Sequence, residues 1–221
     1  MMEKIFKEPE GIIYNGGAIF YAIIAYVIGF VGLFNSSVII NALATLLLGH
    51  AMIIAAYLVH ECSHNLVFKK IRFNTYLGRF LSWICGSSYG TYEDIQYKHF
   101  RHHVDNDDVV WFDYEAFFEK NPAVFKLTKM LEWFYIPAHE FIMHFIMMFS
   151  SFIIPQRKPQ RSRNTAVIII RFSLFLTLML LFPKVGVLYI FSYILLITVL
   201  RFMDSLQHDY PYNLTLFTRE K

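Results

Sequence analysis

Six of the nine histidines in the 221-residue sequence fall into three short clusters. The clusters are "HECSHN" with His60 and His64, "KHFRHH" with His99, His102 and His103, and "RFMDSLQHD" with His208. On a helix that turns 100° per residue, the first pair lies within about 40° and the second cluster within about a 100° sector. Imidazoles that leave one helical face together are poor core residues but good ligands for zinc, iron, copper or nickel. The spacing therefore predicts a metal site to which all six contribute.

The first cluster can be interpreted in two ways. As H-E-x-x-H it is typical of zinc proteases, with His60 and His64 as ligands and Glu61 as the general base. A catalytic zinc takes three protein ligands and a water, so six imidazoles exceed what one zinc holds. Two metals with nitrogen ligands favour oxygen activation, and iron suits it because zinc cannot supply electrons. Glu61 is then either a carboxylate that orients a ligating imidazole or a charge on the opposite side of the helix.

Asp204 is a candidate for a supporting role at the third cluster. It precedes His208 by four residues, so the two side chains share one face of a helix. The alternative is an ion pair between Asp204 and Arg201, which lies one turn earlier on the same face.

Three further histidines are weaker candidates for metal binding. His50 lies about 15 Å from His60 along a continuous helix, and we expect it to be a packed, neutral core histidine. His139 and His144 are five residues apart, so on a helix their side chains diverge by nearly 140°. The spacing of this last pair does not favour a shared metal.

Four apolar segments have to position these clusters. Hydrophobic residues make up 56% of the chain, and the mean hydropathy is +0.42. A spanning helix needs about 17–25 mostly apolar residues. The segments that meet this requirement are Ala18–Phe34, Val38–Val59, Thr165–Phe182 and Val185–Met203. We expect an all-α polytopic membrane protein with four transmembrane helices in two hairpins and a helical cytoplasmic cap, forming one domain over residues 1–221.

The basic residues indicate on which side of the membrane the clusters lie. The segment between the hairpins, Glu61–Asn164, carries thirteen of the twenty Lys and Arg residues, whereas the two hairpin connections carry only Lys184. The positive-inside rule therefore predicts that the N-terminus, the histidine clusters and the C-terminus are cytoplasmic. Arg171, near the start of the third span, is expected to reach toward lipid head groups. The net charge of +3 without a clustered basic face predicts no nucleic-acid partner.

One further apolar stretch, Leu131–Ile154, is long enough to suggest a fifth span. It contains Glu132 and Glu140, and an unpaired charge at mid-bilayer is costly. We expect this stretch to lie at the membrane interface or to dip partway into it, with a break at Pro137. A fifth span here would separate the third cluster from the first by the bilayer.

The motifs "HECSHN", "KHFRHHVDND" and "MDSLQH", with the sequence between them, resemble the integral-membrane fatty acid desaturase and hydroxylase superfamily. The resemblance implies four spans beneath a cytosolic cap and histidine boxes that hold a di-iron centre. It assigns His60 and His64 to the first box and His99, His102 and His103 to the second. His208, with Asp204 one turn before it, matches the extra ligand position ahead of the third box.

The sequence also departs from the family pattern. The family carries another HxxHH motif after the position of His208, and these 221 residues contain no second HxxHH. The resemblance therefore implies that the ligand set is incomplete in this polypeptide alone. We expect a truncated member of the family that lacks the C-terminal part of the domain. A shortened site that recruits His139 and His144 instead is the alternative.

The resemblance implies an oxygen-dependent membrane oxidoreductase without catalytic residues beyond the metal ligands. The expected reaction introduces a double bond into a fatty acyl lipid, with two iron ions, O2 as co-substrate and a separate ferredoxin- or cytochrome-type electron donor. The candidates for the walls of an acyl tunnel are Trp83, Tyr92, Tyr97 and Trp111. Three alternatives stay open: a carotenoid- or alkane-type di-iron hydroxylase, an intramembrane HExxH zinc protease, and an inactive truncated fragment.

Overall fold

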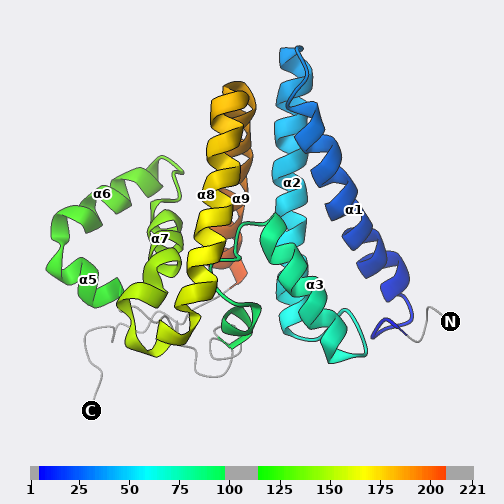
Figure 1. Cartoon of the computed structure of the whole chain (residues 1–221), viewed down its shortest axis with the longest axis horizontal. Helices are drawn as coiled ribbons and strands as arrows, with labels where there is room; N and C mark the ends of the chain where they lie inside the picture. Colours follow the sequence, from blue (N-terminus) through cyan, green and yellow to red (C-terminus); the bar gives the residue numbers. More distant parts are fainter. Residues whose placement is uncertain (1–4, 98–113, 208–221) are drawn as a thin grey trace.

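The computed structural model describes residues 5–97 and 114–207, with side chains for residues 5–97 and 116–203. These residues are helical apart from connections and one isolated bridge between Phe6 and Phe68. α1 (Gly11–Gly32) and α2 (Val38–Ser63) form one hairpin, and α8 (Arg161–Leu181) and α9 (Pro183–Gln207) form the other (Figure 1). The elements between them are α3 (Ile71–Ile84), α5 (Tyr114–Lys120), α6 (Pro122–Trp133), α7 (Ala138–Ile153) and the 3-10 helix η2 (Pro155–Gln160).

Within the described ranges, four helical stretches are long and apolar enough to cross a membrane. They are Gly11–Gly32, Val38–Ser63, Pro155–Leu181 and Pro183–Met203. The predicted all-α membrane fold with two hairpins is therefore confirmed. The first helix begins earlier than predicted, because Phe6 packs on Gly11 and Gly16 in a stretch whose glycines weaken the helix signal of the sequence.

Asn41 fixes the turn of the first hairpin. Its buried side-chain amide donates hydrogen bonds of 3.1 Å to the carbonyls of Gly32, Leu33 and Asn35. Carbonyls at the end of a helix have no partner within the helix, so this side chain replaces the missing donors of α1. Lys184, from the turn of the second hairpin, donates to the Asn35 carbonyl at 2.5 Å and joins the two turns.

α2 is the central helix and contacts α1, α3 and α9. A Cβ on Gly32 of α1 would lie 2.7 Å from the Cβ of Ala44, so α1 can approach α2 only because residue 32 has no side chain. On the α9 side, a Cβ on Gly49 would lie 2.7 Å from Cδ2 of Leu195. α2 is therefore closely packed against α1 on one side and α9 on the other.

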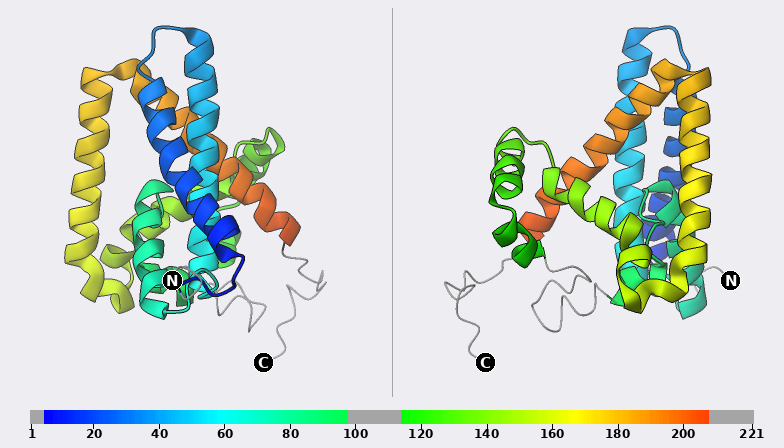
Figure 2. Two further views of the ribbon diagram at one scale, coloured as in Figure 1. Left: turned by 90° about the vertical axis from the view of Figure 1, so that its right-hand side faces the viewer. Right: turned by 60° about the vertical axis from the view of Figure 1, so that its left-hand side comes forward.

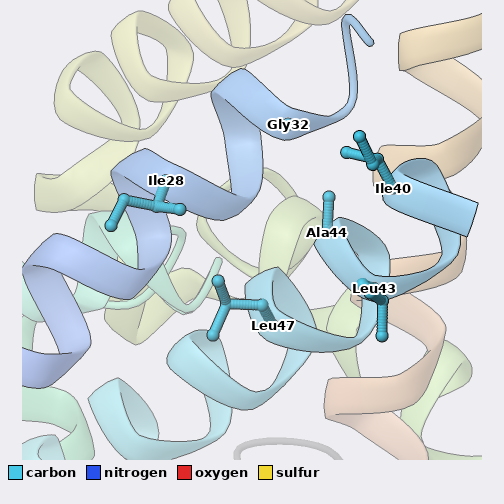
Figure 3. Close-up of a pocket in the computed structure, with 6 residues that line it drawn as sticks. All are labelled: Ile28, Gly32, Ile40, Leu43, Ala44 and Leu47. Carbon is cyan, nitrogen blue, oxygen red and sulfur yellow. The ribbon is translucent and has the colours of Figure 1, made fainter. Parts of the chain in front are cut away.

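An apolar hollow of about 190 Å³ lies between α1 and α2, close to their connecting turn (Figure 3). Its walls are formed by Ile28, Gly32, Ile40, Leu43, Ala44 and Leu47. Ile28 and Leu43 are more than half exposed, so the hollow opens on the outer surface of the bundle. A surface of this kind suits contact with lipid chains.

The stretch Leu131–Ile154 is divided between two helices, as predicted. α6 ends at Trp133 and α7 begins at Ala138, with Pro137 at its N-terminal cap. The turn between them contains Tyr135 in a left-handed conformation, with φ of 58°. α5 and α6 project from the bundle as an arm (Figure 1). The stretch is not among the candidate spans in the described part of the chain.

The C-terminal ends of α2 and α9 lie at the same end of the bundle, opposite the two hairpin turns (Figure 2). The end of α2 carries the first histidine cluster, and the end of α9 leads to the third. With four membrane spans, the C-terminal ends of the second and the fourth must lie on the same side of the membrane, and the structure agrees with this requirement.

Candidate metal centre

His60 and His64 occupy the C-terminal turn of α2. The helix runs through His60 to Ser63, and His64 is its capping residue. The two imidazole rings are 4.9 Å apart between centroids and are inclined by 66°. Cys62 and Ser63, between them in sequence, are buried in the core, whereas both histidines are only partly buried. The two rings therefore lie together at the edge of the bundle.

Glu61 contacts the first histidine of the pair. One carboxylate oxygen of Glu61 lies 3.2 Å from Nδ1 of His60. An imidazole that donates its Nδ1 proton to a carboxylate carries its lone pair on Nε2, the atom that can bind a metal. Glu61 was predicted either to orient a ligating imidazole or to be a charge on the opposite side of the helix. Its contact with His60 favours the first role.

The remaining predicted ligands, His99, His102, His103 and His208, lie outside the described residues. Asp204 belongs to α9, but the structure describes its backbone alone. The approach to the second cluster is described as far as residue 97, and residues 92–97 are helical. Gln96 in this segment donates a hydrogen bond of 2.9 Å from its side-chain amide to the backbone carbonyl of Ser63. The segment that leads into the second cluster thus contacts the turn that carries the first.

A capping box begins this helical segment. The Thr91 hydroxyl accepts a hydrogen bond of 3.0 Å from the Asp94 amide, and the Asp94 carboxylate accepts bonds from the Thr91 amide at 3.0 Å and hydroxyl at 2.6 Å. Reciprocal bonds of this type satisfy backbone donors that the first turn of a helix leaves free. The start of residues 92–97 is therefore defined by the sequence Thr91 to Asp94.

Asp94 also anchors the segment to η2. Its carboxylate accepts a hydrogen bond of 2.9 Å from the guanidinium of Arg157 and one of 3.2 Å from the side chain of Gln160. Burial alone would raise the pKa of Asp94, but the hydrogen bonds from Thr91, the charge of Arg157 and the Gln160 contact outweigh it and hold that pKa below its ordinary value. Asp94 is therefore an ionised carboxylate at neutral pH.

Residues 36–220 match the family model described as fatty acid desaturase. The chain belongs to the fatty acid desaturase family. The match begins just before α2 and extends over all three histidine clusters, which is the region on which the resemblance was based. No curated protein and no solved structure matches the chain. Family membership supports a desaturase- or hydroxylase-type function in an integral membrane protein.

Two arginines of α8 hold the loop that precedes the capping box in this desaturase-family chain. Arg163 donates to the carbonyls of Ser88 and Gly90 at 3.0 and 3.2 Å. Arg171 donates to the Ser88 hydroxyl at 2.6 Å and stacks on the ring of Trp83 at 5.0 Å. Arg171, which was expected from the sequence to reach toward lipid head groups, contacts the Ser88 hydroxyl and the Trp83 ring of this loop.

Arg201 has a described partner on another helix. Its Nε lies 3.5 Å from a carboxylate oxygen of Glu132 in α6. The pairing between Arg201 and Asp204 is therefore not needed to balance the Arg201 charge. This contact also joins the end of α9 to the arm formed by α5 and α6.

His139 and His144 face different neighbours. The His139 ring lies 6.4 Å from the ring of Phe118 in α5, and the His144 ring lies 6.2 Å from the ring of Tyr193 in α9. His144 also donates from Nδ1 to the carbonyl of Glu140 at 2.8 Å. Among the side chains that the structure describes, no three His, Cys, Asp or Glu residues lie together in a way that would hold a metal. The described residues therefore give no support to a site built on His139 and His144.

His50 does not pack in the core as predicted. It is exposed on the bundle surface, where its Nδ1 lies 2.6 Å from the hydroxyl of Tyr21 in α1. The hydroxyl of Tyr21 gives the His50 imidazole a hydrogen-bond partner although the ring is exposed. The sequence could not show this contact, because Tyr21 is 29 residues away. His50 lies about three helical turns before His60 in α2 and is not part of the first cluster.

The aromatic candidates for an acyl tunnel have different environments. Tyr92 is buried with 2% exposure and packs on Gly78 of α3. Trp83 is 41% exposed and stacks against Arg171, and Tyr97 is half exposed. Trp111 lies outside the described residues. The hollow between α1 and α2 is at the opposite end of α2 from the histidine pair, so it does not lead to that pair.

Proposed function

We propose that this chain belongs to an oxygen-dependent fatty acyl desaturase whose metal centre includes ligands from the three histidine clusters. The observation that carries the proposal is the hydrogen bond between Gln96 and Ser63. It brings the segment that enters the second cluster to the turn that carries the first. The proposed iron ligands are His60, His64, His99, His102, His103 and His208.

The geometry around the first pair fits nitrogen ligation of iron. Two imidazoles leave one turn of α2 together, and a carboxylate contacts the nitrogen of His60 that would not bind the metal. His99 and His103 follow Gln96 by three and seven residues, which is the spacing of one helical face. On a helix, the face of Gln96 that contacts α2 would therefore also carry these two histidines.

The residues of the chain would hold and shield the reacting groups. Two iron ions bound by these imidazoles would supply the oxygen activation that the removal of hydrogen from an unactivated carbon requires. The hairpins place the histidine pair at the edge of the apolar spans, where an acyl chain from the bilayer can reach it. Glu61 would hold the His60 ring in one orientation. Electrons would come from a separate ferredoxin- or cytochrome-type partner.

The histidine clusters and both termini are proposed to face the cytoplasm. The positive charges of the segment 61–164 support this side by the positive-inside rule. Labelling intact cells tests it with single cysteines introduced at Leu66, near the pair, and at Ser36, in the hairpin turn. The native Cys62 and Cys85 are buried. We expect labelling from outside at residue 36 only, and labelling at residue 66 alone would reverse the assignment.

Lipid analysis tests the activity. The full chain is produced in a host with an electron-donor system, and acyl chains are analysed by mass spectrometry for new double bonds or hydroxyl groups. We expect double bonds that His60→Ala and His64→Ala abolish, whereas His50→Ala leaves the product unchanged because His50 contacts Tyr21 instead. Hydroxylated products would assign the hydroxylase branch of the family, and unchanged lipids would contradict the proposal.

A further inference from the structure

We infer that Arg157 is a positioning residue, which holds residues 92–97 against the end of α2 through Asp94. The inference rests on the proposed function in one respect: this segment leads into the second histidine cluster. Arg157 does not belong to the histidine clusters, and it lies 63 residues from Asp94 in the sequence. Its role would be to fix where the segment lies.

The pair between Arg157 and Asp94 is buried. The Arg157 side chain is 2% exposed and that of Asp94 is 13% exposed, with 2.9 Å between the guanidinium nitrogen and the carboxylate oxygen. Gln160 bridges the same two groups, since it accepts from Arg157 at 2.9 Å and donates to Asp94 at 3.2 Å. Buried and bridged charges hold a defined geometry, whereas exposed ion pairs exchange with water.

The segment is held on two faces. Asp94 and Gln96 are two residues apart, so on a helix their side chains diverge by about 160°. Asp94 contacts η2 on one face, and Gln96 contacts Ser63 of α2 on the other. Two anchors on opposite faces determine both the rotation of a short helix and its distance from α2. Without the η2 anchor, the described hydrogen bond from Gln96 to Ser63 would have to fix the position of this segment on α2 together with the packing of Tyr92.

The neighbouring ion pair provides a matched control. Glu93 pairs with Arg79, but the two side chains are 51% and 55% exposed. Glu93→Gln therefore removes an acid next to Asp94, in the same helical segment, without breaking a buried contact. Exposed pairs of this kind contribute little to structure.

The experiment measures the position of the segment without using the metal. Spin labels are attached to cysteines introduced at Leu66 and Tyr97, both of which are exposed. The distribution of distances between the labels is recorded by pulsed electron paramagnetic resonance in the otherwise unchanged chain and in Arg157→Gln, Arg157→Lys, Asp94→Asn and Glu93→Gln. Circular dichroism checks that each variant keeps its helix content.

We expect a narrow distribution in the parent and in Glu93→Gln, and a broadened or shifted one in Arg157→Gln. Asp94→Asn keeps the shape of the side chain and should broaden the distribution even if the loss of the arginine impairs folding. Arg157→Lys keeps the charge and should restore part of the order. An unchanged distribution in Arg157→Gln or Asp94→Asn, or equal broadening in Glu93→Gln, would overturn the inference.

Iron content of the same preparations separates this inference from the proposed function. If both hold, Arg157→Gln should bind iron roughly 10-fold more weakly, the size of loss seen when groups that orient ligands are removed. A broadened distance distribution with unchanged iron affinity would uphold the role of Arg157 and contradict the second cluster as a ligand set.

Discussion

The side-chain amide of Gln96 lies 2.9 Å from the backbone carbonyl of Ser63, and these residues are 33 positions apart. Ser63 directly precedes His64, and Gln96 is followed three residues later by His99. One hydrogen bond therefore connects the turn that carries the first histidine cluster with the segment that precedes the second cluster in the sequence. The proposed metal centre depends on this proximity.

Removal of this hydrogen bond should loosen the contact. Gln96→Ala is expected to lower the free energy of unfolding by about 1 kcal/mol, which is typical of one hydrogen bond. Unfolding in mixed micelles, followed by circular dichroism, measures the change. Gln156→Ala is the control, because Gln156 is exposed in η2. Equal stability of the two variants would show that the Gln96 contact does not stabilise the fold.

Because of Asp94, we expect the free energy of unfolding to decrease in acid. Its pKa is held below the ordinary value in the folded chain, so the unfolded chain binds the proton more readily. The stability that this carboxylate contributes is complete above its unfolded pKa of about 4 and is lost as the pH falls through the folded pKa. We expect the unfolding free energy of the wild type to fall more steeply below about pH 5 than that of Asp94→Asn. If the unfolding free energies of the wild type and Asp94→Asn changed with pH in parallel, the lowered pKa of Asp94 would be contradicted.

Breaking the buried pair should also cost stability at neutral pH. Arg157→Gln leaves Asp94 without its charged partner, and the loss of one member of a buried pair typically costs about 3–5 kcal/mol. Glu93→Gln breaks only the exposed pair with Arg79 and should cost less than about 1 kcal/mol. The same micelle unfolding titration compares them, and similar losses in both would mean that burial of Arg157 does not matter.

Gly78 determines how closely the same segment approaches α3. A Cβ at residue 78 would overlap the ring of the buried Tyr92. Gly78→Ala should therefore destabilise the fold by about 1–3 kcal/mol, as overpacking does in other cores. Gly17→Ala is the control, since nothing lies within 4 Å of its Cβ position and alanine favours a helix. A tolerated Gly78→Ala would show that Tyr92 can move.

The turn between α6 and α7 is expected to enter the membrane interface. Trp133 and Tyr135 are 82% and 81% exposed at the connection between α6 and α7, and aromatic side chains of this kind favour the head-group region. A variant with Trp83 and Trp111 changed to Phe leaves Trp133 as the only tryptophan, which can be excited selectively at wavelengths where tyrosine does not absorb. Its emission should be quenched by brominated lipids in vesicles. Quenching by iodide but not by brominated lipid would place the turn in water.

The hydropathy of the sequence was sufficient to predict the four membrane-spanning helices and their pairing into two hairpins. Apolar segments of the right length predict transmembrane helices, and short turns between them predict hairpins. Pro137 correctly predicted the break between α6 and α7, because proline removes a helix donor. The continuation of α2 through His60 also followed from the sequence, since nothing before Ser63 interrupts the helix.

The contacts between distant elements could not be predicted in the same way. The stretch 155–164 contains four basic residues, and no periodicity shows that Arg157 is the buried one. Its partner is 63 residues away. The pattern Thr91-x-x-Asp94 matches a capping box and would have predicted the start of the helical segment. The orientation of Arg171 depends on Ser88 and Trp83, which only the folded chain brings near it.

Metal analysis of the purified full chain tests the proposed centre most directly. Iron and zinc are measured in the same sample by mass spectrometry, for the wild type and for His60→Ala, His64→Ala and His50→Ala. The account predicts iron in the wild type and in His50→Ala, with a loss of more than about 10-fold in the other two variants. About one zinc per chain and no iron would contradict the desaturase proposal and would favour a zinc enzyme built on the H-E-x-x-H motif.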